Sequence, residues 1–417
     1  MSNISQWIRL LEKESDFTVS FIPFTESKEW ILDKNEISHK TGGFFKIIGI
    51  KWKNSYQPLI DQREIGTLGF LMIKNKNRVE FLIQAKIEPG NVNIIQLAPT
   101  YQATASNSFR LHGGKKTPFS NLFLKPKDPI IFESLQSEQG TKFYQKQNKN
   151  MLIEVKNKPI QSKYYKWVNI DDLLELLKKD FLINTDARSV LVCSPWRKII
   201  GRKPFTRYKN AFSEELHKSY YIPPDKTKID TLIKIIFERR KRLYSPTIVP
   251  LKKLEGWEIS NNEIKSIKKN VYSIKQLKVK TKGREVPEWD QPIVVSKMNQ
   301  SIILICQLKN EVLQFGFSFQ IEPGLHNLIE LGPTYIGDRE SRKIEEEIII
   351  SSKQSEEGGR FYQNINNYKI VKVNSNKNKD SSSLIWLTVS EIENLLKLDG
   401  IFTNEARSAI SLILSYL

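Results

Sequence analysis

Side chains suited to proton transfer and anion binding gather in the first half of the chain. The stretch QAKIEPGN, residues 84–91, places Lys86 and Glu88 beside a Pro-Gly turn, where a lysine can polarise a carbonyl and a carboxylate can accept a proton. His112 precedes two glycines in HGGKK. Histidine exchanges protons near neutral pH, since its unperturbed pKa is about 6.5, and glycines let the backbone approach a ligand. The alternative for His112 is an ordinary exposed loop histidine.

Arg110, Lys115 and Lys116 flank that histidine and could bind a diphosphate through charge-assisted hydrogen bonds, or could be plain surface charge. The whole chain of 417 residues carries a net charge of +19. This charge suits nucleic acid, a membrane surface or a phosphate-bearing small molecule, and by itself it selects none of them. The lysines are scattered, which also fits a general compositional bias.

Common cofactor and metal motifs are absent from the sequence. It contains no GxGxxG, GxxxxGK[ST], HExxH or paired CxxC, and its four histidines and two cysteines have no familiar ligand spacing. We therefore expect neither a cofactor nor a metal. Cys193 and Cys306 lie in apolar runs and are expected to be buried thiols. The N-terminal residues do not resemble a secretion signal and no long apolar window follows, so we expect a cytoplasmic protein without membrane contact.

An internal repeat organises the chain. IEPG at 87–90 recurs at 321–324, and LAPTY at 97–101 recurs as LGPTY at 331–335, both at an offset of 234 residues. SEQGTKFYQ at 137–145 matches SEEGGRFYQ at 355–363 at an offset of 218, so the first copy holds 16 additional residues between these motifs. We predict an N-terminal repeat at 1–205, a linker at 206–224 and a C-terminal repeat at 225–417.

Each repeat is predicted to be α+β, a mixed sheet with flanking helices. Runs such as FFKIIGIKW and VEFLIQAKI are typical of strands, whereas DDLLELLKKD has leucines at helical spacing after a capping Asn or Asp. A short helix is expected at the start of each repeat. The Pro-Gly and Gly-Gly turns place their polar neighbours on loops at strand ends, where functional residues often lie.

Comparison of the two copies separates shared from altered polar residues. The shared residues of the first copy have a structural alternative, such as capping a turn or pairing at a helix end; they are Glu88, Thr100, Tyr101, Glu138, Tyr144 and Arg188. Lys86, Asn91 and Gln102 are replaced by Gln320, Leu325 and Ile336 in the second copy. The additional segment contains Asn107, Arg110, His112 and Lys115. These differences favour the first copy as the active one.

The strings QAKIEPGNVNIIQLAPTYQATASN, RLHGGKK, SEQG, KNMLIEV and NTDARSVLVC, with a second round ending in SEEGGRFY and NEARSAI, resemble the NDP-hexose 2,3-dehydratase family over nearly the whole chain. The resemblance implies two tandem domains similar to Nudix hydrolases, and a homodimer. It also implies an active site in one copy and a vestigial nucleotide-sugar pocket in the other. The implied substrate is an NDP-4-keto-6-deoxyhexose, and the product would pass to a 3-ketoreductase.

The implied reaction needs a base, an acid and a donor to the 4-keto oxygen, but no redox cofactor. Glu88 or His112 is the expected base, His112 or Tyr144 the expected acid, and Lys86 the donor. The expected substrate-binding residues are Gln84, Asn91, Gln96, Thr100, Gln102, Asn107, Arg110, Lys115, Glu138 and Arg188.

Two alternatives remain open. A Nudix-like NDP-sugar pyrophosphatase would share the fold, but the glutamate-rich helix signature that holds Mg²⁺ in that family is not satisfied. A basic, non-enzymatic module binding nucleic acid or another protein would explain the charge, but not the additional segment of the first copy.

Overall fold

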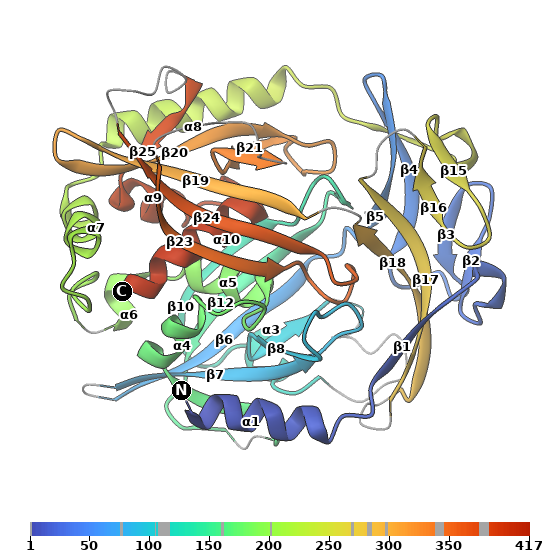
Figure 1. Ribbon diagram of the computed structural model, residues 1–417, viewed down its shortest axis with the longest axis horizontal. Helices are drawn as coiled ribbons and strands as arrows, with labels where there is room; N and C mark the ends of the chain where they lie inside the picture. Colours follow the sequence, from blue (N-terminus) through green and yellow to red (C-terminus); the bar gives the residue numbers. More distant parts are fainter. Residues whose placement is uncertain are drawn as a thin grey trace.

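The computed structural model describes residues 2–75, 78–104, 106, 117–159, 162–200, 202–267, 271–281, 286–296, 299–337, 346–374 and 383–417. These residues form a mixed α+β structure with two large and two smaller sheets (Figure 1). No helix in these ranges is long and apolar enough to cross a membrane. The predicted α+β class is confirmed.

The large sheet of the first repeat has the strand order β10-β12-β6-β7-β13, with β8 paired to β7 and β9 paired to β6. The β12–β6 pair is parallel and the other pairs are antiparallel. Its strands are β6 (Gly66–Asn75), β7 (Arg78–Ile87), β8 (Ile95–Ala98), β9 (Tyr101–Ala103), β10 (Ile130–Ser137), β12 (Gln147–Glu154) and β13 (Tyr165–Asn169).

The large sheet of the second repeat has the equivalent order, β23-β24-β19-β20-β25, with β21 on β20 and β22 on β19. Its parallel pair is β19–β24, the counterpart of β6–β12. The strands are β19 (Gln300–Lys309), β20 (Val312–Ile321), β21 (Ile329–Gly332), β22 (Tyr335–Gly337), β23 (Glu346–Ser355), β24 (Ile365–Val373) and β25 (Ile385–Leu387). The repeat seen in the sequence is therefore present in the fold.

Two smaller sheets lie together on the side opposite the C-terminus (Figure 1). One has the order β1-β17-β16-β15 with β18 on β17, and the other β11-β5-β4-β3-β2 with β14 on β4. Their strands are β1 (Thr18–Ile22), β2 (Trp30–Leu32), β3 (Glu36–His39), β4 (Lys46–Trp52), β5 (Ser55–Asp61), β11 (Phe143–Tyr144), β14 (Thr247–Val249), β15 (Trp257–Ile259), β16 (Ile264–Ser266), β17 (Tyr272–Lys280) and β18 (Glu288–Ser296).

The two repeats exchange their first strands. Strand β1 pairs with β17 of the second repeat, Thr18 opposite Lys280, and β14 pairs with β4 of the first repeat, Thr247 opposite Lys51. Figure 1 shows the blue strand β1 running beside β17. Each smaller sheet is thus built from both repeats, which the sequence ranges alone did not indicate.

Helices cover the large sheets, and α4 begins at the expected capping residue. They are α1 (Ser2–Lys13), α3 (Ser120–Leu124), α4 (Ile170–Leu176), α5 (Thr185–Cys193), α6 (Trp196–Ile200), α7 (Ala211–Tyr221), α8 (Lys226–Lys241), α9 (Val389–Leu395) and α10 (Asn404–Ile413), with short 3₁₀ turns at Phe24–Glu26, Leu251–Lys253 and Leu414–Tyr416. The cap of α4 is Asn169, which accepts the Asp171 N–H at 2.9 Å. The predicted linker, 206–224, contains α7.

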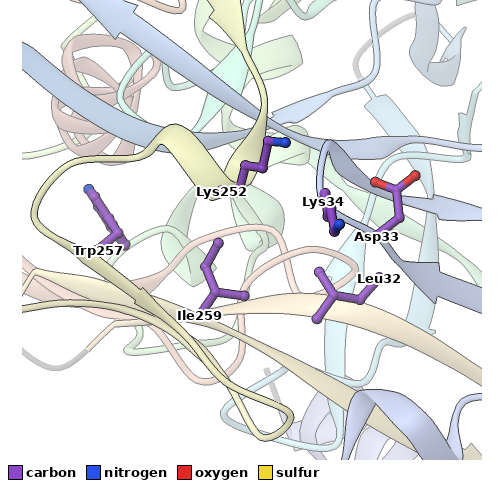
Figure 2. Close-up of a pocket in the computed structure, with 6 residues that line it drawn as sticks. All are labelled: Leu32, Asp33, Lys34, Lys252, Trp257 and Ile259. Carbon is purple, nitrogen blue, oxygen red and sulfur yellow. The ribbon is translucent and has the colours of Figure 1, made fainter.

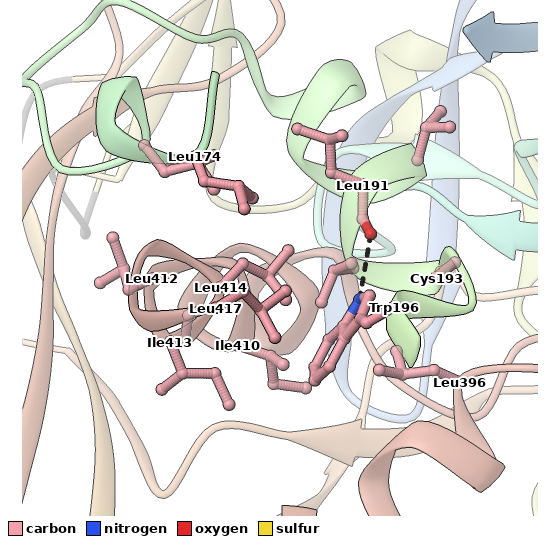
Figure 3. Close-up of a cluster of buried hydrophobic side chains, with 14 of the residues drawn as sticks. Leu174, Leu191, Cys193, Trp196, Leu396, Ile410, Leu412, Ile413, Leu414 and Leu417 are labelled. Carbon is pink, nitrogen blue, oxygen red and sulfur yellow. Dashed lines mark hydrogen bonds between the residues drawn. The ribbon is translucent and has the colours of Figure 1, made fainter. Parts of the chain in front are cut away.

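The central core joins the two repeats through α5 and α10. Figure 3 shows Leu191 and Trp196 of the first repeat packed near Ile410, Leu414 and other apolar residues of the C-terminal end. The indole Nε1 of Trp196 donates to the carbonyl of Leu191 at 3.3 Å. Cys193 lies in this core, and both cysteines are buried and free, as predicted.

Two fully buried arginines tie these helices together. Arg188 on α5 donates to the Oγ of Ser411 at 3.1 Å, and Arg407 on α10 donates to the Oγ of Ser189 at 2.9 Å. The same guanidinium groups donate to main-chain carbonyls, including that of Leu177 at 2.9 Å. Buried charges are tolerated where their donors are satisfied in this way.

Candidate active site

The two IEPG turns cross from one repeat to the other. The Gly90 N–H donates to the Gly358 carbonyl at 2.7 Å, and the Gln363 N–H donates to the Gly90 carbonyl at 2.8 Å. In the same way, the Gly324 N–H donates to the Gly140 carbonyl at 2.8 Å. Each turn therefore docks on the Ser-Glu-x-Gly loop of the opposite repeat.

Close approach explains the glycine of each turn. A Cβ atom on Gly90 would lie 1.8 Å from the carbonyl oxygen of Phe361, and one on Gly324 would lie 1.7 Å from that of Phe143. Neither position could hold a side chain without moving the backbone. The shared glycines thus serve the contact between repeats.

Several polar side chains lie together, mostly buried, where the first IEPG turn meets the second repeat. The Nζ of Lys86 lies 2.8 Å from Oε1 of Glu88, and the Nε2 of Gln102 donates to the same oxygen at 3.4 Å. Asn184, the cap of α5, donates to Oε1 of Gln102 at 3.1 Å. We call the following set the first cluster: Lys86, Glu88, Gln102, Glu138, Lys146, Asn184, Asp186, Glu357 and Arg360.

Three further carboxyl groups belong to the first cluster, and the charges of Glu88 and Glu138 act on the other two, Asp186 and Glu357. Glu138 accepts from Asn148 at 2.7 Å and from Asn404 at 3.0 Å. Burial raises the pKa of Glu138, and it raises the pKa of Asp186 well above its usual range. Burial together with the charge of Glu88 raises the pKa of Glu357 to about 7. Such shifts are common where acid–base chemistry occurs.

The cations of the first cluster come from both repeats. Lys146 donates to the Glu64 carbonyl at 2.6 Å, and burial lowers its pKa to about 8, opposed by the charges of Glu138 and Glu64. Arg360, from the second repeat, lies over the Phe45 ring at 4.1 Å and donates to Oε1 of Gln62 at 3.3 Å. A negatively charged ligand would find positive groups from both halves of the chain.

The additional segment of the first repeat starts at the edge of this cluster. The Ser106 N–H donates to Oε2 of Glu64 at 2.7 Å, and its hydroxyl donates to Oε1 at 2.8 Å. These bonds outweigh burial and lower the pKa of Glu64. The predicted residues that follow lie outside the described residues; they are Asn107, Arg110, His112 and Lys115.

The second repeat has a counterpart with different charges, which we call the second cluster: Lys142, Glu322, Glu330, Glu356 and Glu405. Lys142 lies 2.5 Å from Oε2 of Glu356. Burial raises the pKa of Glu330 to about 7 and that of Glu322 well above its usual range. In this cluster Gln320 and Asn364 stand where the first cluster has Lys86 and Lys146. The second cluster therefore has the same number of carboxyl groups and fewer lysines.

Other predicted residues lie around the first cluster or within the fold. Gln84 lies two residues before Lys86 on the same face of β7. Asn91 donates to the Lys86 and Ile94 carbonyls, both at 3.2 Å, and so closes the turn. Gln96 donates to the Oγ of Ser355 at 2.5 Å. These contacts support the turn and the junction between repeats.

Thr100, Arg188 and Tyr144 lie apart from Lys86 and Glu88. Thr100 bridges β6 and β7 by accepting the Leu71 N–H at 3.0 Å and donating to the Leu82 carbonyl. Arg188 is the buried arginine between α5 and α10. The Tyr144 ring packs on Ile48, Ile50 and Leu59, with the Arg63 guanidinium 5.6 Å from its centre.

The sequence comparison missed several members of the first cluster. Glu357 and Arg360 belong to the second copy. A search for site residues within the first copy alone therefore did not include them. Lys146 carried a usable signal, because Asn364 replaces it in the second copy. Asp186 lies in the NTDARS motif, two residues before Arg188, and the motif gives no sign that the two side chains point to different places.

Two open hollows among the described residues lie elsewhere. One of about 440 Å³ is bordered by Leu32, Lys34, Lys252 and Trp257 on the smaller sheets (Figure 2), and its neighbour of about 490 Å³ shares Lys252. Neither is bordered by the first cluster. No three His, Cys, Asp or Glu side chains in the described ranges are placed to hold a metal ion.

Comparison with known proteins agrees with the arrangement of two repeats. The family described as NDP-hexose 2,3-dehydratase matches residues 1–194 and 232–413. A dTDP-4-dehydro-6-deoxy-α-D-glucopyranose 2,3-dehydratase of Saccharopolyspora spinosa is 29% identical over 97% of this chain and 89% of its own length. An enzyme with the same name from Amycolatopsis orientalis is 26% identical over 99% of this chain and 89% of its own length. Another, from Streptomyces violaceoruber, is 27% identical over 95% of this chain and 93% of its own length. With matches that run through both repeats, the chain belongs to the NDP-hexose 2,3-dehydratase family.

Proposed function

We propose that the protein removes water from an NDP-4-keto-6-deoxyhexose and forms an NDP-3,4-diketo-2,6-dideoxyhexose in the first cluster. Family membership supports the reaction type. The names of the three relatives support a 4-keto-6-deoxyglucose carried by dTDP as the first substrate to test. The same comparisons favour this activity over the pyrophosphatase and the non-enzymatic binding module.

The chemistry follows from the ketone at C4. It acidifies the hydrogen on C3, so a base can remove that proton while the electron pair moves toward the carbonyl oxygen. The C2–O bond then breaks, the C2 hydroxyl leaves as water after protonation, and an enol with its hydroxyl on C3 remains. Transfer of a proton from that hydroxyl to C2 gives the 3,4-diketone. Substrate and product differ by one water, so no oxidant or reductant is consumed.

Lys86 and Glu88 are the residues that we propose to act on C3 and the ketone. Their ion pair at 2.8 Å, joined by Gln102, is the observation that carries the proposal. Glu88 as a carboxylate can accept the C3 proton, and Lys86 can donate to the 4-keto oxygen as negative charge develops there. Gln320 stands in the place of Lys86 in the second cluster, so that pair is absent there.

His112 and Tyr144 are further candidates for proton transfer. His112 could act as the base or the acid, and Tyr144 as the acid. The additional segment that carries His112 leaves the described structure at Ser106, next to Glu64. Arg110 and Lys115 of the same segment are the proposed diphosphate ligands.

Several wider features are also proposals. The family resemblance supports repeats of Nudix-like topology at 1–205 and 225–417, a vestigial nucleotide-sugar pocket in the second, and a homodimer. The two buried, free cysteines support a cytoplasmic location. A 3,4-diketone is readily reduced, and we propose that a 3-ketoreductase consumes it.

A direct assay tests the activity. Purified protein is incubated with dTDP-4-keto-6-deoxyglucose without added cofactor, and mass spectrometry is expected to find a nucleotide sugar lighter by one water. Lys86→Ala serves as the matched inactive control. Unchanged substrate across dTDP, UDP and GDP sugars would contradict the proposal, and release of a nucleoside monophosphate would instead support a pyrophosphatase.

A further inference from the structure

We infer that Glu357, a residue of the second repeat, is the acid that protonates the departing C2 hydroxyl in the site of the first repeat. This inference rests on the proposed function and adds a catalytic residue to it. It replaces His112 and Tyr144 in the role of acid and leaves Glu88 as the base.

The crossed turns hold Glu357 against the proposed base. Its neighbour Gly358 accepts the Gly90 N–H at 2.7 Å, and Gln363 at the end of the same loop donates to the Gly90 carbonyl at 2.8 Å. Gly90 lies two residues after Glu88. The loop and the turn are therefore fixed to one another, and the carboxyl group of Glu357 lies within electrostatic reach of Glu88 and Lys86.

Glu357 is the least buried of the carboxyl residues in the first cluster. It is half-buried, whereas Glu88, Glu138 and Asp186 are only 7%, 6% and 3% exposed. Within the described part of the chain, its hydrogen-bond donor is the Gly359 N–H, 3.1 Å from Oε1. The other carboxyl oxygen is left to meet a substrate hydroxyl.

The surroundings of Glu357 favour the protonated form that an acid requires. Burial, with the negative charge of Glu88, raises its pKa to about 7, although Arg360 and Lys86 oppose the shift. A carboxylic acid with this pKa holds a proton near neutral pH and can release it in the transition state.

The second cluster lacks this acid. Its residue at the position of Glu357 is Gln139, supplied by the first repeat through the symmetric crossing of the loops. An amide has the shape of the acid but cannot deliver its proton to a leaving group. The first cluster, which contains Lys86, therefore has the carboxyl group of Glu357, whereas the second cluster has the amide of Gln139 at the same position.

Protons and electrons balance in the proposed step. Glu88 takes the C3 proton, the electron pair of that bond forms the enolate, and the C2–O bond breaks as Glu357 gives its proton to the leaving oxygen. The reaction ends with Glu88 protonated and Glu357 ionised. Transfer of one proton between them through solvent restores the enzyme.

Hydrogen exchange at C3 separates the acid from the base. In D₂O, with dTDP-4-keto-6-deoxyglucose, Glu357→Gln is expected to eliminate water at least about 100-fold more slowly than wild type, while deuterium still enters C3. Glu88→Gln is expected to lose both exchange and elimination. Glu322→Gln in the second cluster is the matched control and keeps both.

The pH profile of the wild-type enzyme provides a test that needs no variant. The rate of elimination is expected to fall as pH rises through about 7, because Glu357 then loses its proton. The charged groups around Glu357 are Glu88, Lys86, Glu138, Asp186, Lys146 and Arg360.

Two results would overturn the role of Glu357. One is wild-type elimination by Glu357→Gln, and the other is loss of C3 exchange together with elimination in a variant that unfolds at the wild-type temperature. If Glu357→Gln fails to fold, a wild-type rate that does not fall above pH 7 overturns the role. Failure of the wild-type protein to eliminate water from any nucleotide sugar would instead refute the proposed function itself.

Discussion

Gly90→Ala is expected to loosen the junction between the two repeats. The added Cβ would lie 1.8 Å from the Phe361 carbonyl oxygen, whereas ordinary contacts begin near 3.4 Å, so the turn must move by about 1.6 Å. A movement of this size breaks two main-chain hydrogen bonds, of 2.7 and 2.8 Å. Overpacking costs about 1–3 kcal/mol and each lost hydrogen bond about 1 kcal/mol, so we expect a loss of about 3–5 kcal/mol in the free energy of unfolding.

Urea denaturation followed by circular dichroism measures this loss, with Gly43→Ala as the control. A Cβ on Gly43 meets only the Oγ1 of Thr41 at 3.4 Å, so that variant should change the free energy by less than about 1 kcal/mol. Gly324→Ala should destabilise the protein as much as Gly90→Ala does, since its Cβ would lie 1.7 Å from the Phe143 carbonyl oxygen. Gly90→Ala acts on the turn that carries Glu88 and on the loop that carries Glu357, so it should lose more turnover than Gly324→Ala. Stability of Gly90→Ala equal to that of Gly43→Ala would refute the close-contact argument.

Three further outcomes are expected. Lys86→Ala should lower turnover by about 100-fold at an unchanged unfolding temperature, while Glu322→Ala keeps turnover nearly intact; equal losses would mean that the active repeat is misassigned. Glu330→Gln should remove a pH dependence of stability, measured by urea unfolding at pH 5 and pH 7.5. Burial raises the pKa of Glu330 from 4.5 to about 7, so the folded state binds its proton more tightly, and wild type should lose up to about 3 kcal/mol as pH rises through this range. Arg188→Met should cost about 3 kcal/mol in the same measurement, because three buried acceptors lose their donor; wild-type stability would contradict its structural role.

The repeat and its main elements could be predicted because their signals are local or periodic. The constant offset of IEPG and LAPTY required the two large sheets to share one strand order, and Asn169 marked the start of α4. The segment 206–224 also held a helical signal that was not used. Phe212, Leu216 and Tyr220 recur every four residues, and they are buried on α7.

The composition of the first cluster could not be predicted from the same signals. Strand periodicity shows which face of β7 is buried, but it does not show which distant loop will cover its end. Comparing Lys86 with Gln320 correctly separated the two copies in charge. It nevertheless left Glu357 with the second copy, because the crossing of the loops depends on contacts between residues far apart in the sequence, such as Gly90 with Gly358.

The exchanged strands affect how the chain can fold as it is synthesised. Strand β1 is among the first segments to leave the ribosome, yet its partner β17 ends at Lys280, so β1 must wait for most of the chain before it is paired. Closing such a long loop is slow, and until then the edge of a sheet stays open to wrong partners. A gene encoding either repeat alone would leave its first strand without the sheet that receives it. Although the two repeats arose as copies of one unit, each now needs the other in order to fold.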